Sequence, residues 1–90
     1  MKMNHKQVLY NLLETMVAAA ESNSKKTLIK LNKQYETELN KTTLSKRNDY
    51  HQDYDLLRNS CMCSIYPAFQ SLRDKLIQDA QERFSKLSKP

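Results

Sequence analysis

Apolar residues recur every three or four positions along most of this chain, which is the spacing of one face of an α-helix. The first such run follows Asn4, a residue type that often caps the start of a helix, and it stops at the polar cluster Ser22-Asn23-Ser24. The pattern predicts a helix over about residues 4–21, with the wide apolar face that is typical of a helix packed between two neighbours. That face consists of Val8, Leu9, Leu12, Leu13, Met16, Val17 and Ala20.

A second apolar stripe runs from about residue 24 to about residue 64 and keeps its helical phase throughout. One interpretation is a single helix about 60 Å long, at about 1.5 Å per residue. The alternative is a break at Thr42-Thr43 or at Asn48-Asp49, because Thr and Asn are weak helix formers. Asp49 followed by Gln52 also resembles a capping box. The stripe consists of Leu28, Leu31, Tyr35, Leu39, Thr42, Tyr50, Tyr54, Leu57 and Cys61.

Two charged residues bear on that choice. Lys46 and Asp53 would both lie inside the apolar stripe of a continuous helix. Burying a charge is costly unless the charge is paired. Either the helix breaks near residues 42–49, or this part of the stripe faces water or a binding partner.

The last run predicts a helix over about residues 67–87. Pro67 suits the first helical turn, where its missing N–H costs no hydrogen bond. Lys86 and Lys89 lie near the C-terminal end, where the helix dipole favours cations. The apolar stripe of this helix consists of Tyr66, Phe69, Leu72, Leu76, Ile77, Ala80, Phe84 and Leu87.

The composition supports an all-α fold. The 90 residues contain no glycine, although about six would be expected from average usage. Without glycine the chain lacks the residue that hairpin turns, Walker loops and dinucleotide-binding loops require. We therefore expect a single all-α domain, either an antiparallel helical hairpin or a small three- to four-helix bundle, with a long and possibly broken central helix. A central helix of about 60 Å would outrun the other two, which predicts a homodimer or a complex with another chain.

Charge and cysteine content restrict the setting in which the chain works. The net charge of +5 is spread among acidic residues with no long block of one sign. Two cysteines are too few for a disulfide framework and favour a reducing, cytoplasmic location. Polar residues interrupt the apolar N-terminal stretch, so it does not fit a signal peptide, and no apolar run is long enough for a membrane span.

The two cysteines are candidates for chemistry. On a helix, Cys61 and Cys63 would be about 200° apart, so they could neither share a zinc ion nor form an unstrained disulfide with each other. We expect Cys61 to be a small core residue and Cys63 to be a surface or interface thiol. A metal or redox role, or an intermolecular disulfide, is less favoured because the other ligands it needs have no recognised spacing.

The two histidines offer little more. His51 and Asp55 are four residues apart, on the face opposite the apolar stripe, and we interpret them as a solvated helix pair. His5 lies near a helix start with no evident partner. No serine or cysteine nucleophile has a base nearby in the sequence, so we expect no enzyme activity, no cofactor and no metal.

These observations favour a non-catalytic protein-interaction module, such as an adaptor, a small chaperone or an inhibitor of a larger cytosolic machine. It would dock through an amphipathic helix face. Because Tyr and Arg are favoured at interfaces, the predicted contact residues are Tyr50, Tyr54, Leu57 and Arg58. The alternative is nucleic-acid binding through a basic ridge on the second helix. That ridge consists of Lys25, Lys26, Lys30 and Lys33.

Overall fold

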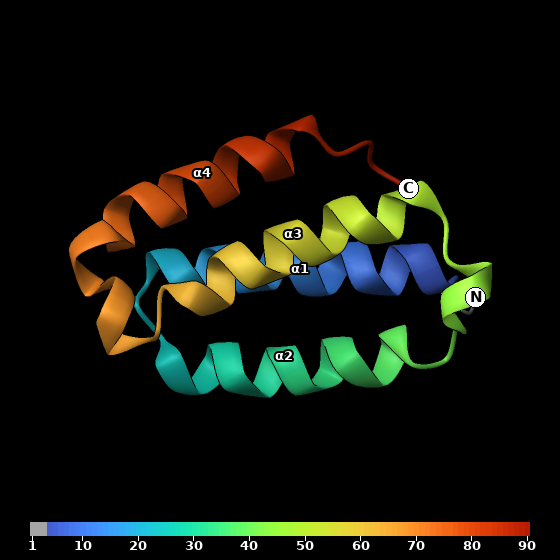
Figure 1. Cartoon of the computed structure of the whole chain (residues 1–90), viewed down its shortest axis with the longest axis horizontal. Helices are drawn as coiled ribbons and strands as arrows, with labels where there is room; N and C mark the ends of the chain where they lie inside the picture. The colour runs from blue at the N-terminus through green and yellow to red at the C-terminus, as the bar shows by residue number, and fades with distance from the viewer. Residues whose placement is uncertain (1–3) are drawn as a thin grey trace.

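A computed structural model describes residues 4–90, which form four α-helices, two short 3₁₀ helices and no strand. The helices run alternately in opposite directions, so each is antiparallel to the next (Figure 1). The predicted all-α bundle is therefore confirmed. The elements are α1 (His5–Glu21), α2 (Lys25–Leu39), η1 (Leu44–Lys46), α3 (Asp49–Cys63), η2 (Pro67–Leu72) and α4 (Arg73–Lys86).

The central apolar run is broken rather than continuous. Helix α2 ends at Leu39 and α3 begins at Asp49, with η1 in the connection between them. Lys46 and Asp53 are both exposed, as the cost of burying their charges requires. The described chain measures 38 × 26 × 25 Å, so no helix overhangs the bundle. The homodimer prediction rested on such an overhang and loses that basis.

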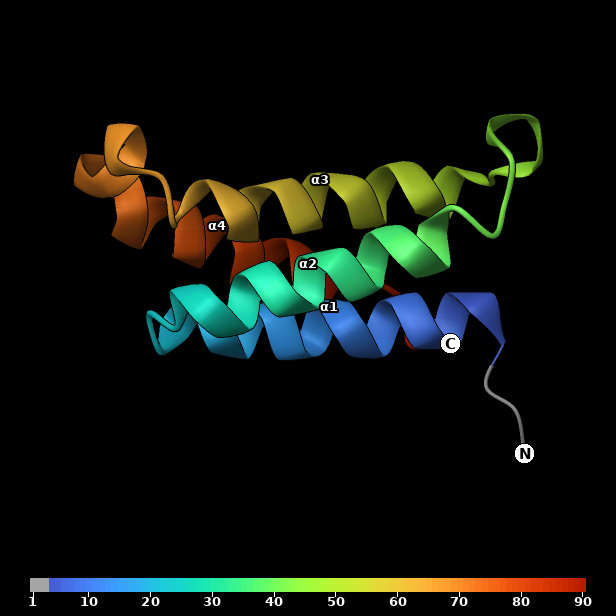
Figure 2. The same cartoon turned by 90° about the horizontal axis from the view of Figure 1, so that it is seen from below.

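Helix α1 is the centre of the packing. It contacts α2, α3 and α4. In the view of Figure 2, α2 lies in front of α1 and α3 lies above it. Its predicted apolar face is the reason, because a face this wide can be covered only by several neighbours. The core consists of Leu9, Tyr10, Leu13, Met16, Val17, Ala19, Ala20, Leu28, Tyr35, Leu39, Tyr54, Leu57, Cys61 and Ala80.

The turn between α1 and α2 shows how the chain reverses direction without glycine. Asn23 adopts φ 54°, in the left-handed region where glycine is usual and asparagine is the best substitute. The N–H of Ser24 donates to the carbonyl of Ala19 (2.9 Å), and the N–H of Asn23 donates to that of Ala20 (3.1 Å). These two bonds make a Schellman motif, which satisfies the last carbonyls of α1 and sends the chain back along it.

The predicted last helix begins later than its pattern indicated. Residues 67–72 form the 3₁₀ helix η2, and the α-helix starts only at Arg73. The chain has to reverse between α3 and α4, and Gln70 holds the reversal by donating to the carbonyl of Ser64 (3.2 Å). This segment therefore lies at the end of the bundle, and three members of the predicted stripe, Tyr66, Phe69 and Leu72, are exposed instead of buried.

The core predicts opposite outcomes for two neighbouring substitutions in α3. Leu57 is fully buried, so Leu57→Ala should lower the free energy of unfolding by about 2–5 kcal/mol. The buried hydroxyl of Tyr54 has no hydrogen-bond partner among the described residues, and burial raises the pKa of this phenol to about 12. Because that hydroxyl is desolvated without compensation, Tyr54→Phe should leave stability unchanged or raise it by up to about 1 kcal/mol.

Urea unfolding followed by circular dichroism measures both changes. Tyr66→Phe, at an exposed tyrosine, is the matched control and should have no effect. A loss of more than about 1 kcal/mol in Tyr54→Phe would show that the hydroxyl is bonded after all.

Candidate functional site

A row of exposed apolar side chains lies along η2. A 3₁₀ helix has about three residues per turn, so residues three apart lie above one another. Tyr66, which caps η2, and Phe69 and Leu72 within it have this spacing, and they are 52%, 38% and 50% exposed. Contiguous exposed apolar side chains of this size mark an interaction surface more often than isolated ones do.

A groove adjoins this row, between α2 and the end of α3. Its apolar lining comes from Ile29 on α2, from Met62 and Ile65 near the end of α3, and from Tyr66 and Pro67. Tyr66 belongs to both the row and the groove, so the two are continuous. Together they are called the η2 surface below. The polar residues that line the groove are Lys25, Asn32, Lys33 and Glu36.

The groove is positively charged on balance. Arg58 of α3 holds its one lining carboxylate, that of Glu36, at 3.3 Å, and also donates to Asn32 at 3.3 Å. Lys25 and Lys33 make no ion pair within residues 4–90. Two uncompensated ammonium groups therefore flank the apolar lining of the groove.

The predicted contact residues do not form one surface. Tyr54 and Leu57 are 1% and 0% exposed, so a docked partner could not touch them without opening the bundle. Tyr50 is half-buried and stacks on His51, with ring centroids 4.1 Å apart. Arg58 reaches the edge of the groove through Glu36. Tyr54 and Leu57 are buried because the break before α3 lets this helix turn its apolar stripe toward α1.

The predicted basic ridge does exist as a surface. Lys25, Lys26, Lys30 and Lys33 are all exposed on α2. Buried Leu28 and Tyr35 mark the face of α2 that meets the core, and Lys26, Lys30 and Lys33 point away from it. No carboxylate of the described chain lies within ion-pair distance of these four lysines.

A polar cluster that the sequence did not reveal lies at the opposite end of the bundle from η2. His5, at the start of α1, and His51, in the first turn of α3, bring their Nε2 atoms to 3.0 Å. The other ring nitrogen of His5, Nδ1, lies 3.5 Å from the carboxylate of Glu38 near the end of α2. The hydroxyl of Thr42 is 3.3 Å from His5 Nε2. Three helix ends and a loop therefore meet at two imidazoles.

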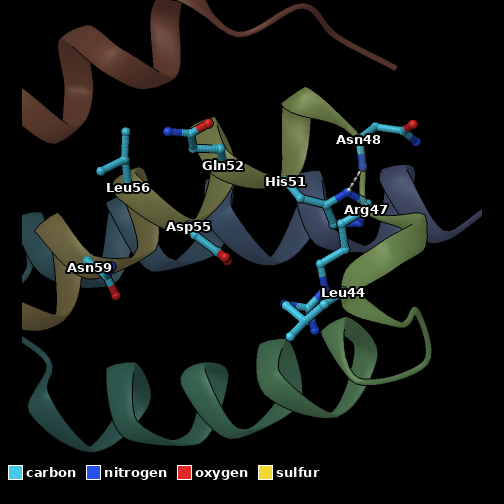
Figure 3. A pocket seen from close by; sticks show the side chains of 8 residues that line it. All are labelled: Leu44, Arg47, Asn48, His51, Gln52, Asp55, Leu56 and Asn59. Carbon is cyan, nitrogen blue, oxygen red and sulfur yellow. Dashed lines mark hydrogen bonds between the residues drawn. The ribbon is translucent and has the colours of Figure 1, made fainter.

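The interpretation of His51 and Asp55 as a solvated pair was wrong. His51 is 3% exposed, and its Nδ1 accepts the backbone N–H of Asn48 at 2.9 Å, which is the dashed line in Figure 3. The N-cap of α3 is thus Asn48, one residue before the predicted Asp49. Its partner in the capping box is His51, where Glu or Gln is usual. The signal in the sequence was Asn48 followed three residues later by a side chain able to accept a hydrogen bond.

Burial is the main cause that lowers the pKa of His51, and the neighbouring His5 lowers it further. The charge of Asp55 raises this pKa, while the charge of Arg47 lowers it. The cluster therefore favours a neutral imidazole at position 51.

The pocket shown in Figure 3 lies along α3 and the preceding loop. Its cationic side chain, Arg47, is already used, because it donates to the carbonyls of Leu39 and Thr42 and so caps the end of α2. Asp55 points toward the gap between α3 and α2, while Leu56 points to the other side of α3 (Figure 3). The lining holds no nucleophile paired with a base, and residues 4–90 hold no group of three metal-binding side chains.

The cysteines lie on different sides of α3. Cys61 is buried in the core, as predicted, and Cys63 is half-buried. Burial raises the pKa of the Cys61 thiol to about 12, so it carries almost no thiolate at neutral pH. Both thiols are free.

No protein-family model, curated protein or solved structure matched the chain. None of the helices in the described part of the chain is long and apolar enough to cross a membrane. What the chain does must therefore be argued from its surfaces.

The difference in burial predicts how the two thiols react. With excess Ellman's reagent at pH 8, Cys63 should react in the native protein, whereas Cys61 should react only after urea is added, because it is buried and protonated. The absorbance should show about one thiol per chain without denaturant and two with it. Cys63→Ser is the control, and it should remove the native signal; two reactive thiols in the native state would contradict the burial of Cys61.

Proposed function

We propose that this chain is a non-catalytic protein-interaction module that binds an apolar segment with acidic neighbours, from a partner protein, on the η2 surface. The observation that carries the proposal is the exposed row of Tyr66, Phe69 and Leu72, continuous with a groove that two free lysines flank. Adaptors, small chaperones and inhibitors all use surfaces of this kind, so the choice among them remains a prediction, as does the cytoplasmic location.

The apolar part of the surface supplies the affinity. Removing apolar area from water contributes about 25 cal/mol per Å². Tyrosine is among the residues that most often dominate binding energy, and aromatic side chains are enriched at interfaces. Tyr66 stands where the row meets the groove, and Phe69 extends the apolar area along η2. We therefore expect these two rings to be the main anchors.

The charged part of the surface selects the partner. Lys25 and Lys33 flank the groove, and Lys26 and Lys30 lie beside them on α2, all without a carboxylate partner in the described chain. Glu36 does not offset them, because Arg58 already holds it. Acidic residues next to the apolar anchors of the partner would be attracted to this edge, which raises the association rate and disfavours basic competitors.

The shape of the surface fits a helical segment better than an extended one. The groove runs between two helices, and the row on η2 continues from it at Tyr66. A helix presents apolar residues at spacings of three and four along one face, which is how amphipathic segments dock in grooves between helices. No sheet edge exists in residues 4–90 to which an extended segment could add a strand.

A displayed library of random twelve-residue peptides tests the proposal on the immobilised full-length chain. We expect enriched peptides to carry apolar residues three or four apart with Asp or Glu beside them. Phe69→Ser should weaken their binding at least about tenfold, because a buried aromatic anchor is worth more than about 1.4 kcal/mol. Lys25→Glu/Lys33→Glu should weaken it further at low salt. Fluorescence anisotropy with a labelled peptide measures each dissociation constant.

Leu44→Ser is the matched control, since Leu44 is 80% exposed but lies in η1, away from this surface. Peptides that bind Phe69→Ser as tightly as the unaltered chain would overturn the proposal. Light scattering that shows a dimer dissociated by Phe69→Ser would also overturn it, because the occupant of the surface would then be a second copy.

Nucleic-acid binding is the second candidate, and the unpaired ridge of four exposed lysines favours it. Four phosphate contacts to duplex DNA should give a logarithmic salt slope of about −3.6. Lys26→Glu/Lys30→Glu should remove most of the binding while Lys86→Glu, on α4, should not. Anisotropy of a labelled 20-base-pair duplex between 20 and 200 mM salt measures the slope. No retention at 20 mM salt would eliminate this candidate.

A further inference from the structure

Two imidazoles that face each other through their Nε2 atoms share one proton. The distance of 3.0 Å between His5 Nε2 and His51 Nε2 is that of a hydrogen bond, so one nitrogen donates and the other accepts. Two N–H groups could not point at each other at this distance. The contact therefore restricts how many protons the pair holds, and it joins the first residue of α1 to the first turn of α3.

The cap of α3 decides which histidine is the donor. His51 Nδ1 accepts the N–H of Asn48 at 2.9 Å, so this nitrogen carries no proton. A neutral His51 then has its proton on Nε2 and donates it to His5 Nε2. A neutral His5 in turn has its proton on Nδ1, 3.5 Å from Glu38. The hydrogen bonds thus assign three of the four ring nitrogens, and a neutral His5 places its proton on the fourth, Nδ1.

We propose that the pair is a pH-sensitive latch, which holds the starts of α1 and α3 together at neutral pH and opens when it takes up one more proton. A proton added to His5 Nε2 would face the N–H of His51. A proton added to His51 Nδ1 would face the N–H of Asn48. In either case the folded arrangement loses a hydrogen bond, so the added proton can be accommodated only by moving the helix starts apart or by releasing the cap.

The charged groups around the pair act in both directions. The carboxylate of Glu38 on α2 lies 3.5 Å from His5 Nδ1, and Lys41 offsets part of its charge at 3.4 Å. In the loop and α3, Arg47 opposes and Asp55 favours a charge on His51. Tyr50 stacks on His51, and the ammonium of Lys6 of α1 lies 5.0 Å from the centre of the Tyr50 ring. These opposite charges leave burial and the hydrogen-bond geometry as the deciding influences.

The sign of the pH dependence follows from burial. An unfolded histidine binds its proton near pH 6.5, whereas the pKa of His51 is lowered in the folded chain. The folded state therefore binds fewer protons in this range than the unfolded state does. The contribution of the latch to stability is fully present above about pH 6.5 and is lost as the pH falls below it. Opening would free the loop of residues 40–48 and uncover Tyr50, which now stacks on His51.

His51→Gln separates the latch from general acid destabilisation. A glutamine at this position can accept the N–H of Asn48 through its oxygen and donate to His5 through its nitrogen, and it does not titrate. In the unaltered chain, the hydrogen-exchange protection factor of the Asn48 amide should fall by up to about tenfold per pH unit as the pH drops below about 6.5, because opening takes up one proton. In His51→Gln, where one of the two imidazoles is gone, the fall should be smaller between pH 7.5 and 5, measured relative to the Leu13 amide of the core.

Glu38→Gln is the second variant and tests whether the carboxylate, rather than the imidazole pair, is the titrating group; the fall in protection should persist in it. An equal fall in His51→Gln and in the unaltered chain would overturn the proposal, and so would a level profile in the unaltered chain. If His51→Gln does not fold, nitrogen-15 spectra of the unaltered chain at pH 7.5 decide. They should show protons on His51 Nε2 and His5 Nδ1, and a proton on His51 Nδ1 would overturn the latch. None of these results bears on the η2 surface.

Discussion

The wide apolar face of α1 is the constraint on which the rest of the structure depends. Leu9, Leu13 and Met16 are fully buried because α2, α3 and α4 each cover part of this face. A single long partner helix could cover only one side of α1, so the central run has to break and return. The break between α2 and α3 and the up-and-down order of the helices are therefore two consequences of the same need to bury one face.

Much of the fold was predictable from local patterns. Asn4 does cap α1, the polar cluster at 22–24 does end it, and the glycine-free composition does correspond to an all-α bundle. The apolar phase continues across the break in the central run, so the pattern allows both a continuous helix and a broken one. Phase is a local signal, whereas the break is stabilised by contacts between distant parts of the chain, such as those of His5 with Thr42 and His51.

The candidate sites were less predictable, for related reasons. Tyr54 and Leu57 were correctly recognised as part of an apolar stripe, but a stripe does not show whether its cover comes from the same chain or from another. Phe69 and Leu72 had the right spacing for a buried α-helical face and became exposed because that segment is a 3₁₀ helix in a chain reversal. The histidine pair joins residues 46 positions apart, so no local pattern could indicate it.

The short connections between antiparallel helices also bear on how quickly this chain reaches its native state. The contacts of α1 with α2 and of α3 with α4 join segments that follow each other directly, and the Schellman turn at Asn23 orients the first of these hairpins with local bonds alone. Chains dominated by such near-neighbour contacts fold in microseconds to milliseconds. The contact between α1 and α4 closes the largest loop, so the docking of the last helix carries the largest entropy cost of loop closure.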